Sequence, residues 1–210
     1  MDNKKLIIWD FDGPIVDSRQ LALELSQHQY HDVTEDVHRN LFNGNIFTEL
    51  SKLKKKDVSH EQHVEFLEKS YWPRKMELAP VPQITKVLEE LSQDFVMVIN
   101  SSSDSPQIKE YLEKNNLENL FSKIYGNEIR SKEEKFKMIL QDFSVSSKDC
   151  LLITDTLGDV TEAETLAIPS VVTLWGYQLK HHFDSVNHKV VFVEHPIELT
   201  EAVRSHFSKS

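Results

Sequence analysis

Short runs of apolar residues, many of them branched, recur along the chain. The runs are KLIIW (5–9), FVMVI (95–99), CLLIT (150–154), SVVTLW (170–175) and VVFV (190–193). Their apolar positions are continuous rather than alternating, which is typical of strands that are covered on both faces. The pattern therefore predicts the strands of a buried parallel sheet.

Segments with helical spacing lie between several of these runs. Residues 105–116 begin with Ser-Pro, so we expect Ser105 to cap a helix that has proline in its first turn. Two further segments, 82–93 and 133–143, each place four apolar residues on one helical face, namely Ile84, Val87, Leu88 and Leu91 in the first and Phe136, Ile139, Leu140 and Phe143 in the second. Strands that alternate with helices predict an α/β fold, a Rossmann-like doubly wound parallel sheet.

The stretch from residue 18 to residue 78 departs from this alternation. It contains amphipathic segments such as RQLALELSQH and HEQHVEFLEKSYW and no strand pattern. We therefore expect an all-helical cap inserted at 18–78, and a core made of residues 1–17 and 79–210. The lysine run KLKKK (52–56) is interpreted as a solvated helix end.

Composition and charge limit the classes of partner that the protein can be expected to bind. The 210 residues carry 24 Lys and Arg against 34 Asp and Glu, a net charge of −10. This balance argues against nucleic acid as the main partner, but it leaves room for a small anionic substrate in a local cleft. The single cysteine, Cys150, opens an apolar run and is interpreted as a core residue. The apolar stretch near the N-terminus is too short for a signal peptide or a membrane span, so we expect a cytoplasmic protein. As a separate expectation, the protein is a monomer or a homodimer.

Polar residues follow three of the predicted strands. Asp10 and Asp12 follow the first, Ser101 follows the second within NSSS, and the run 150–154 continues as TDTLGD with Asp155 and Asp159. In open parallel sheets, ligands bind at the carboxyl ends of the strands, so we expect these side chains to meet there. Lys132 begins a helix just upstream of the run 150–154.

Four carboxylates at one site repel one another. At ~4 Å and an effective dielectric constant near 20, each like-charge pair costs about 4 kcal/mol. A hard divalent cation would relieve the repulsion, and oxygen-only ligands point to Mg²⁺. One aspartate could then act as a nucleophile while its neighbour is held protonated as a general acid. Ser101 and a lysine would hold the oxygens of a phosphoryl group.

Taken together, these residues resemble the haloacid dehalogenase-like phosphohydrolases over essentially the whole chain. DFDGPIVDS resembles the first motif of that family, VMVINSS the second, Lys132 the third and LLITDTLGD the fourth, all in the family's order. The resemblance implies a Rossmann-like core with a small helical cap, as in phosphoglycolate phosphatases and β-phosphoglucomutases.

The resemblance also implies a role for each motif residue. Asp10 would be the nucleophile, Asp12 the general acid/base, and Ser101 and Lys132 the phosphoryl-binding groups. Mg²⁺ would be held by Asp10, by Asp12 through its backbone carbonyl, by Asp155, and by Asp159 directly or through its water shell. The cap loop NLFNGNIF (40–47) would bring Asn43 and Gly44 over the substrate, and Ser102 would also face it.

Several positions leave alternatives open. Ser102 could replace Ser101 in the second motif, because Asn100 interrupts the strand, and Lys135 could replace Lys132. Pro14 and Thr154 stand where the family usually has threonine and a small residue. Ser103 and Ser105 are interpreted as helix-capping residues, and the Gly44 segment could be a plain turn.

The function expected from these features is Mg²⁺-dependent hydrolysis of a small phosphorylated metabolite through an aspartyl-phosphate. A sugar phosphomutase would use the same residues. A receiver-like or non-catalytic Mg²⁺- and phosphate-binding module is the alternative from another class. Receiver domains are shorter and lack a helical insertion after the first strand. Asp12, placed to activate water, would also prevent a long-lived phosphorylated state.

Overall fold

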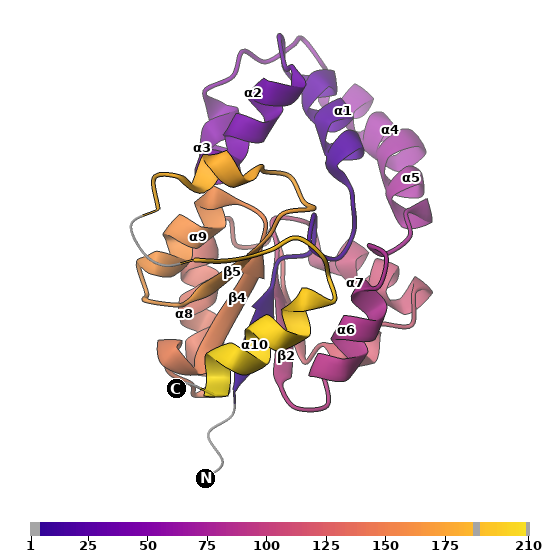
Figure 1. Ribbon diagram of the computed structural model, residues 1–210. Helices are drawn as coiled ribbons and strands as arrows, with labels where there is room; N and C mark the ends of the chain where they lie inside the picture. The colour runs from indigo at the N-terminus through magenta and orange to yellow at the C-terminus, as the bar shows by residue number, and fades with distance from the viewer. Residues whose placement is uncertain (1–4, 187–189, 209–210) are drawn as a thin grey trace.

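The computed structural model describes residues 5–186 and 190–208 (Figure 1). The outermost ends of the expected core segments, 1–4 and 209–210, lie outside the described residues. Within the described residues the chain forms one six-stranded parallel sheet, in the order β3-β2-β1-β4-β5-β6. The strands are β1 (Leu6–Trp9), β2 (Val96–Asn100), β3 (Lys123–Tyr125), β4 (Cys150–Thr154), β5 (Ser170–Thr173) and β6 (Val191–Val193). The predicted α/β fold is therefore confirmed.

Helices cover both faces of this sheet. Successive residues of a strand point to opposite faces, so each strand packs against both helix layers. Ile7 and Trp9 pack with α6 (Ile84–Leu91), α7 (Ser105–Lys114) and α10 (Glu198–Ser208). Leu6 and Ile8 pack on the other face, with α8 (Lys132–Phe143) and α9 (Leu157–Glu164). Burial on both faces explains why the strands read as continuous apolar runs.

Two local predictions were wrong. The pattern predicted no strand at Lys123–Tyr125, because β3 has three residues, one of them charged, and lies at the sheet edge, where only one neighbour constrains it. Ser105 is the first residue of α7 rather than its cap: the capping position is Asp104, and Pro106 lies in the first turn. Both differences concern short-range features that apolar periodicity does not detect.

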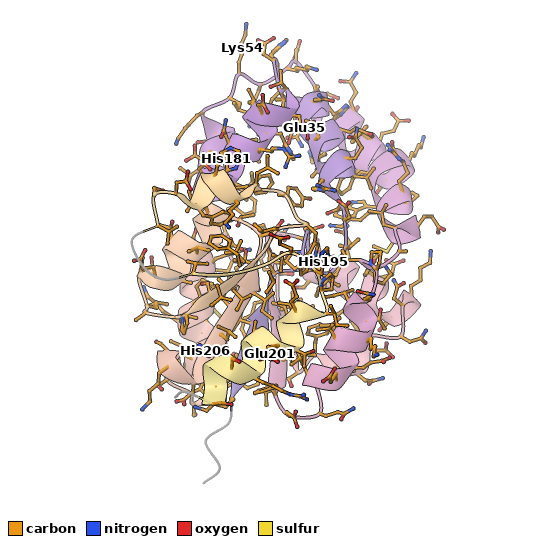
Figure 2. All side chains as sticks on the ribbon, viewed as in Figure 1. Glu35, Lys54, His181, His195, Glu201 and His206 are labelled. Atoms are coloured by element: carbon orange, nitrogen blue, oxygen red, sulfur yellow. The ribbon has the colours of Figure 1, made fainter. Side chains whose placement is uncertain are left out.

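The stretch between residues 18 and 78 is helical and lies beyond the carboxyl edge of the sheet (Figure 1). It consists of α1 (Arg19–Gln29), α2 (Glu35–Asn40), α3 (Ile46–Ser51), α4 (His60–Phe66), a π-helix at Leu67–Tyr71 and α5 (Trp72–Glu77), with a 3₁₀ turn at Leu41–Asn43. Lys54, from the lysine run, projects at the outer end of this lobe (Figure 2). No helix among the described residues is long and apolar enough to cross a membrane.

We expect Leu152→Ala in β4 to lower the free energy of unfolding by about 2–5 kcal/mol, because the side chain is buried in the core and its removal leaves a cavity. Urea unfolding would measure the change. Leu179→Ala is the matched control: that leucine is 47% exposed, so its loss should change stability by less than about 0.5 kcal/mol. Equal losses in the two variants would contradict the assigned core.

Candidate active site

The carboxyl ends of β1, β2 and β4 lie side by side, which brings together the predicted site residues that follow these strands. Trp9 of β1 is in register with Ile99 of β2 and Ile153 of β4, so the chains leave the sheet side by side. Asp10 follows β1, and its backbone N–H donates to the carbonyl of Ile153 at 2.8 Å. Because the strand order reverses between β1 and β4, this is the position at which open parallel sheets bind ligands.

Lys132 connects two of the expected carboxylates. It is the first residue of α8, 5% exposed, and its Nζ lies 3.1 Å from Asp10 Oδ1 and also donates to Asp159 Oδ2. Burial alone would lower the pKa of Lys132, but the two carboxylates outweigh burial and raise that pKa above its ordinary value. The lysine is therefore a fixed cation beside Asp10.

Lys135, the alternative lysine, faces the backbone instead. Its Nζ donates to the carbonyl oxygens of Ser101 at 2.5 Å and Gly126 at 3.3 Å. Burial, together with the nearby Lys132 cation, lowers the pKa of Lys135 to about 8. The contacts of Lys135 hold the main chain that carries Ser101, whereas Lys132 reaches the carboxylates.

Asp155 is enclosed by glycines. A side chain at Gly13 or Gly176 would place its Cβ 2.1 Å or 2.0 Å from Asp155 Oδ2, and Gly13 has a φ of +99° that disfavours other residues. Asp155 Oδ2 accepts a hydrogen bond from the backbone N–H of Tyr177 at 2.5 Å. Its Oδ1 is buried and finds no hydrogen-bond partner among the described residues. Such an atom is costly to bury unless it binds something.

The donor set at this edge fits a hard cation. Burial and the neighbouring carboxylates Asp159 and Asp155 raise the pKa of Asp10 against the opposing effect of Lys132, and burial raises the pKa of Asp155 to about 8. A cation beside Asp10 and the unpaired Asp155 Oδ1 would favour their ionised forms. Among the described residues, however, no three Asp, Glu, His or Cys side chains converge closely enough to hold a metal by themselves.

The carboxylates of the other two expected ligands, Asp159 and Asp12, are already engaged by other groups. Asp159 Oδ2 accepts from Lys132 and, at 2.7 Å, from the hydroxyl of Thr154. The carboxylate of Asp12 turns toward Ser18, Ser103 and Lys75. A metal here would therefore depend on main-chain oxygen or water in addition to Asp10 and Asp155.

Asp12 lies in a network of donors. Ser18 and Ser103 each donate a hydroxyl hydrogen bond to it at 2.5 Å, and the Nζ of Lys75 lies 2.7 Å from its Oδ1. Burial would raise the pKa of Asp12, but the Lys75 ammonium and the three hydrogen bonds more than offset burial and lower that pKa overall. These surroundings favour the carboxylate form of Asp12. The expectation that Asp12 is held protonated concerned a site with a bound cation, and it stays a prediction.

Sequence reasoning missed Lys75 and assigned Ser103 only a capping role. Lys75 is 2% exposed, lies in α5 at the end of the helical lobe, and also approaches the rings of Phe11, Tyr71 and Trp72 within 6 Å. In sequence it is one lysine in a polar stretch, so no local signal distinguishes it. Ser103 lies two residues beyond the expected Ser101, and its hydroxyl accepts from Lys75 at 3.1 Å.

Two unusual residues of the motifs have defined contacts. The Thr154 hydroxyl donates a hydrogen bond to Asp159, which a glycine at that position could not do. The carbonyl of Pro14 accepts a hydrogen bond from the Trp175 indole at 3.3 Å. Neither substitution disturbs the strand ends that carry Asp10 and Asp155.

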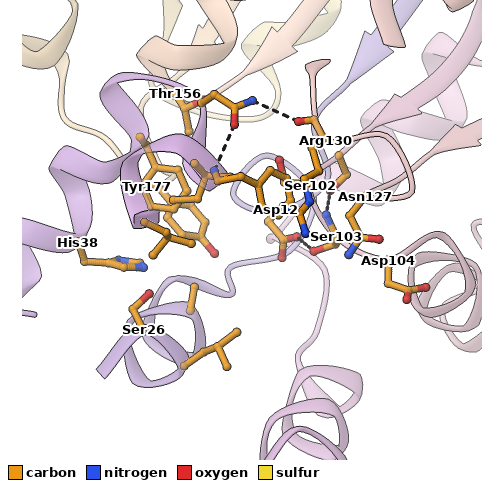
Figure 3. Close-up of a pocket in the computed structure, with 18 of the residues that line it drawn as sticks. Asp12, Ser26, His38, Ser102, Ser103, Asp104, Asn127, Arg130, Thr156 and Tyr177 are labelled. Carbon is orange, nitrogen blue, oxygen red and sulfur yellow. Dashed lines mark hydrogen bonds between the residues drawn. The ribbon is translucent and has the colours of Figure 1, made fainter. Parts of the chain in front are cut away.

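The residues expected to contact substrate divide into two groups. Ser102 lines the cavity described below, on the core side next to Ser103 and Asn127 (Figure 3). Asn43 does not line that cavity; its Oδ1 accepts from Gln178 at 2.7 Å. Gly44 lines the cavity and also lies so close to α9 that a Cβ at Gly158 would be 2.4 Å from the Gly44 carbonyl oxygen.

A cavity of about 700 Å³ separates the core from the helical lobe. Asp10, Asp12, Ser101 and Lys132 line its core end, and side chains from residues 22–72 form the opposite wall. Figure 3 shows Asp12 facing this space between Tyr177 on one side and Ser102 and Arg130 on the other. This volume lies in the range of pockets that bind small molecules.

A sequence profile of haloacid dehalogenase-like hydrolases matches residues 7–173. The chain belongs to this family of hydrolases. The predicted resemblance is thereby confirmed. No curated protein matches the sequence of this haloacid dehalogenase-like hydrolase.

Solved structures of distant sequence share the fold. A haloacid dehalogenase-like hydrolase, SP0104 from Streptococcus pneumoniae, has 21% identity and a TM-score of 0.74, covering 97% of this chain and 100% of its own. A predicted phosphoglycolate phosphatase from Haemophilus somnus has 17% identity and a TM-score of 0.71, covering 97% and 99%. A protein from Thermotoga maritima, provisionally assigned as a β-phosphoglucomutase, has 18% identity and a TM-score of 0.69, covering 96% and 99%.

We expect Lys75→Met to lower the stability of this hydrolase at pH 7 by about 3–5 kcal/mol, because Asp12, whose side chain is only 19% exposed, is left without its cation. The depressed pKa of Asp12 contributes stability above its unfolded value of 3.8, and this contribution is lost as the pH falls below 3.8. The difference between variant and wild type should therefore shrink at acid pH. Urea unfolding over a pH series measures this.

Lys114→Met is the matched control, because its ion pair with Glu77 is exposed and such pairs contribute about 0–1 kcal/mol. A Lys75→Met variant as stable as this control, or one whose deficit does not depend on pH, would contradict the ion pair.

Proposed function

We propose that the protein is a Mg²⁺-dependent phosphatase that removes phosphate from a small phosphorylated metabolite through an aspartyl-phosphate. The observation that carries this proposal is the pairing of Asp10 with the buried cation Lys132, beside the unpaired Asp155 Oδ1. Phosphoryl transfer needs a nucleophile, a fixed positive charge and room for a metal. Asp10 and Lys132 line the polar end of the cavity, and Asp155 follows the strand next to that of Asp10. Membership of the hydrolase family supports the assignment.

In the first step, a carboxylate oxygen of Asp10 attacks phosphorus, and the bond from phosphorus to the alcohol oxygen of the substrate breaks. Asp12 donates a proton to the departing alcohol. The carboxylate form of Asp12 dominates in the free site, and a phosphate dianion bound beside it raises its pKa by like-charge repulsion, which favours protonation before transfer. Lys132 and Ser101 hold the phosphoryl oxygens during transfer.

In the second step, the Asp12 carboxylate takes a proton from water, and the resulting hydroxide attacks phosphorus. The bond between phosphorus and Asp10 breaks, inorganic phosphate leaves, and the Asp10 carboxylate is restored. Lys75, Ser18 and Ser103 orient the same carboxylate oxygens through both proton transfers. One residue thus serves as acid and then as base.

Asp10 and Asp155 would hold Mg²⁺ together with the main-chain carbonyl of Asp12, while Asp159 would support the site from its bonds to Lys132 and Thr154. When bound, the metal would neutralise the crowded carboxylates and the charge that develops on the phosphoryl oxygens. Residues 18–78 would act as the cap that excludes bulk water, and residues 1–17 with 79–210 as the catalytic core.

We expect the wild type to release phosphate from a panel of small monoesters with Mg²⁺, and Asp10→Asn and Asp12→Asn each to lose at least about a thousandfold in kcat. A colorimetric phosphate assay with substrate-depletion analysis measures this. Asp17→Asn is the matched control, because Asp17 is exposed and pairs with Arg19. Full activity in Asp10→Asn would rule out the nucleophile, and isomerised sugar phosphate without free phosphate would favour a phosphomutase.

We expect Mg²⁺ to raise the melting temperature of the wild type, because a ligand that binds only the folded state stabilises it by RT ln(1 + [L]/Kd), about 1.4 kcal/mol at ten times Kd. Asp155→Asn should abolish the shift, since it removes the carboxylate with the unpaired oxygen. Differential scanning calorimetry measures the shift without any substrate. If Mg²⁺ raised the melting temperature of Asp155→Asn as much as that of Asp17→Asn, the assigned metal site would be wrong.

A further inference from the structure

The wall of the cavity opposite the carboxylates combines apolar side chains with uncharged polar ones such as Ser26, Gln29 and Ser51. It is formed by side chains of the helical lobe, among them Leu25, Phe42, Phe47, Leu50, Leu67 and Trp72. All six are only partly buried, although they lie inside the protein. Apolar surface left open inside a cavity gains free energy when an apolar ligand covers it.

Two aromatic pairs line the cavity close to the groups that contact Asp12. Phe42 packs on Tyr177 with ring centroids 4.6 Å apart, and the Tyr177 hydroxyl lies 2.9 Å from the Ser18 hydroxyl that donates to Asp12. Tyr71 and Trp72 pack edge to face at 4.7 Å near Lys75. Phe42 lies in the turn just before α3 and Tyr177 in the loop after β5, whereas Tyr71 and Trp72 lie where the π-helix meets α5, on the other side of the lobe (Figure 1).

The same wall offers little charge to a substrate. Among the described residues of 18–78 that line the cavity, Lys55 is the one Lys, Arg, Asp or Glu, and it is exposed. Burial lowers the pKa of His38 to about 4 and also lowers that of His63, so both rings are neutral near pH 7. On the core side, the exposed Arg130 has its guanidinium 5.3 Å from the centre of the Phe47 ring.

We propose that the alcohol part of the substrate is an apolar group of aromatic size, bound between the Phe42–Tyr177 and Tyr71–Trp72 pairs and against Leu25 and Leu50. This inference rests on the proposed phosphatase function, since it concerns what the phosphoryl group is attached to. A carboxylate such as that of phosphoglycolate would face no buried cation on the cap wall. Between the two aromatic pairs and against Leu25 and Leu50, a sugar would leave hydroxyl groups without partners, which costs free energy.

The test compares benzyl phosphate with methyl phosphate, 2-phosphoglycolate and glucose 6-phosphate in the presence of Mg²⁺. We expect kcat/KM for benzyl phosphate to exceed that for each of the other three by at least about tenfold, the selectivity that apolar contacts commonly give. Calorimetric titration with benzylphosphonate and methylphosphonate, which are not hydrolysed, should show the same preference in binding.

Leu25→Asn should reduce the ratio of kcat/KM for benzyl phosphate to kcat/KM for methyl phosphate about tenfold. Leu23→Asn is the matched control in the same helix, because Leu23 is also half-buried but does not line this cavity. Leu50→Asn, on α3, repeats the test from a second helix should Leu25→Asn fold poorly.

The outcomes separate this inference from the proposed function. If phosphoglycolate or glucose 6-phosphate is hydrolysed as well as benzyl phosphate, and benzylphosphonate binds no better than methylphosphonate, the apolar substrate class is wrong while the phosphatase stands. If no ester is hydrolysed but benzylphosphonate still binds preferentially and Leu25→Asn removes that preference, binding of an apolar group in the cavity is supported and the phosphatase is not.

Discussion

The repulsion among carboxylates at one sheet edge is the constraint on which the rest of the site depends. Asp10 and Asp155 follow neighbouring strands, and Asp159 lies one helical turn after Asp155. Like charges this close would cost several kcal/mol if uncompensated. Lys132 compensates one side of the group by reaching both Asp10 and Asp159, and the other side retains the unpaired Asp155 Oδ1. Gly13 and Gly176 have no side chain, which leaves room for the carboxylate of Asp155 between their backbones.

The helical lobe is tied to the same electrostatic system. Lys75, near the end of the lobe, forms an ion pair with Asp12. Because Lys75 is buried, water cannot replace Asp12 as the partner of its ammonium group. Elsewhere the lobe meets the core through polar contacts, including Asn45 to Glu162 at 3.0 Å and Gln178 to Asn43 at 2.7 Å. Lys75, by contrast, contacts Asp12, which lines the polar end of the cavity. The protonation state of Asp12 therefore depends on where the lobe sits as well as on the core motifs.

The sequence predicted the fold well because each central strand is buried on both faces and so reads as an apolar run. It also predicted which residues meet, since Asp10, Ser101 and Asp155 each follow such a run and the parallel sheet aligns the ends. It did not predict β3, whose three residues at the sheet edge carry almost no pattern. It also missed Lys75 and the hydroxyl of Ser103, because their importance arises from a contact over more than 60 residues of sequence with Asp12.

The same reasoning explains why substrate chemistry is harder to read than reaction chemistry. Reaction groups sit at strand ends, where local sequence and sheet geometry together fix their positions. The opposite wall is assembled from α1, α3, the π-helix and α5, whose apolar faces also serve ordinary helix packing. Leu25 and Leu23 look alike in sequence, yet only Leu25 lines the large cavity. Where charge is absent from such a wall, the three-dimensional arrangement of uncharged side chains is what selects the substrate.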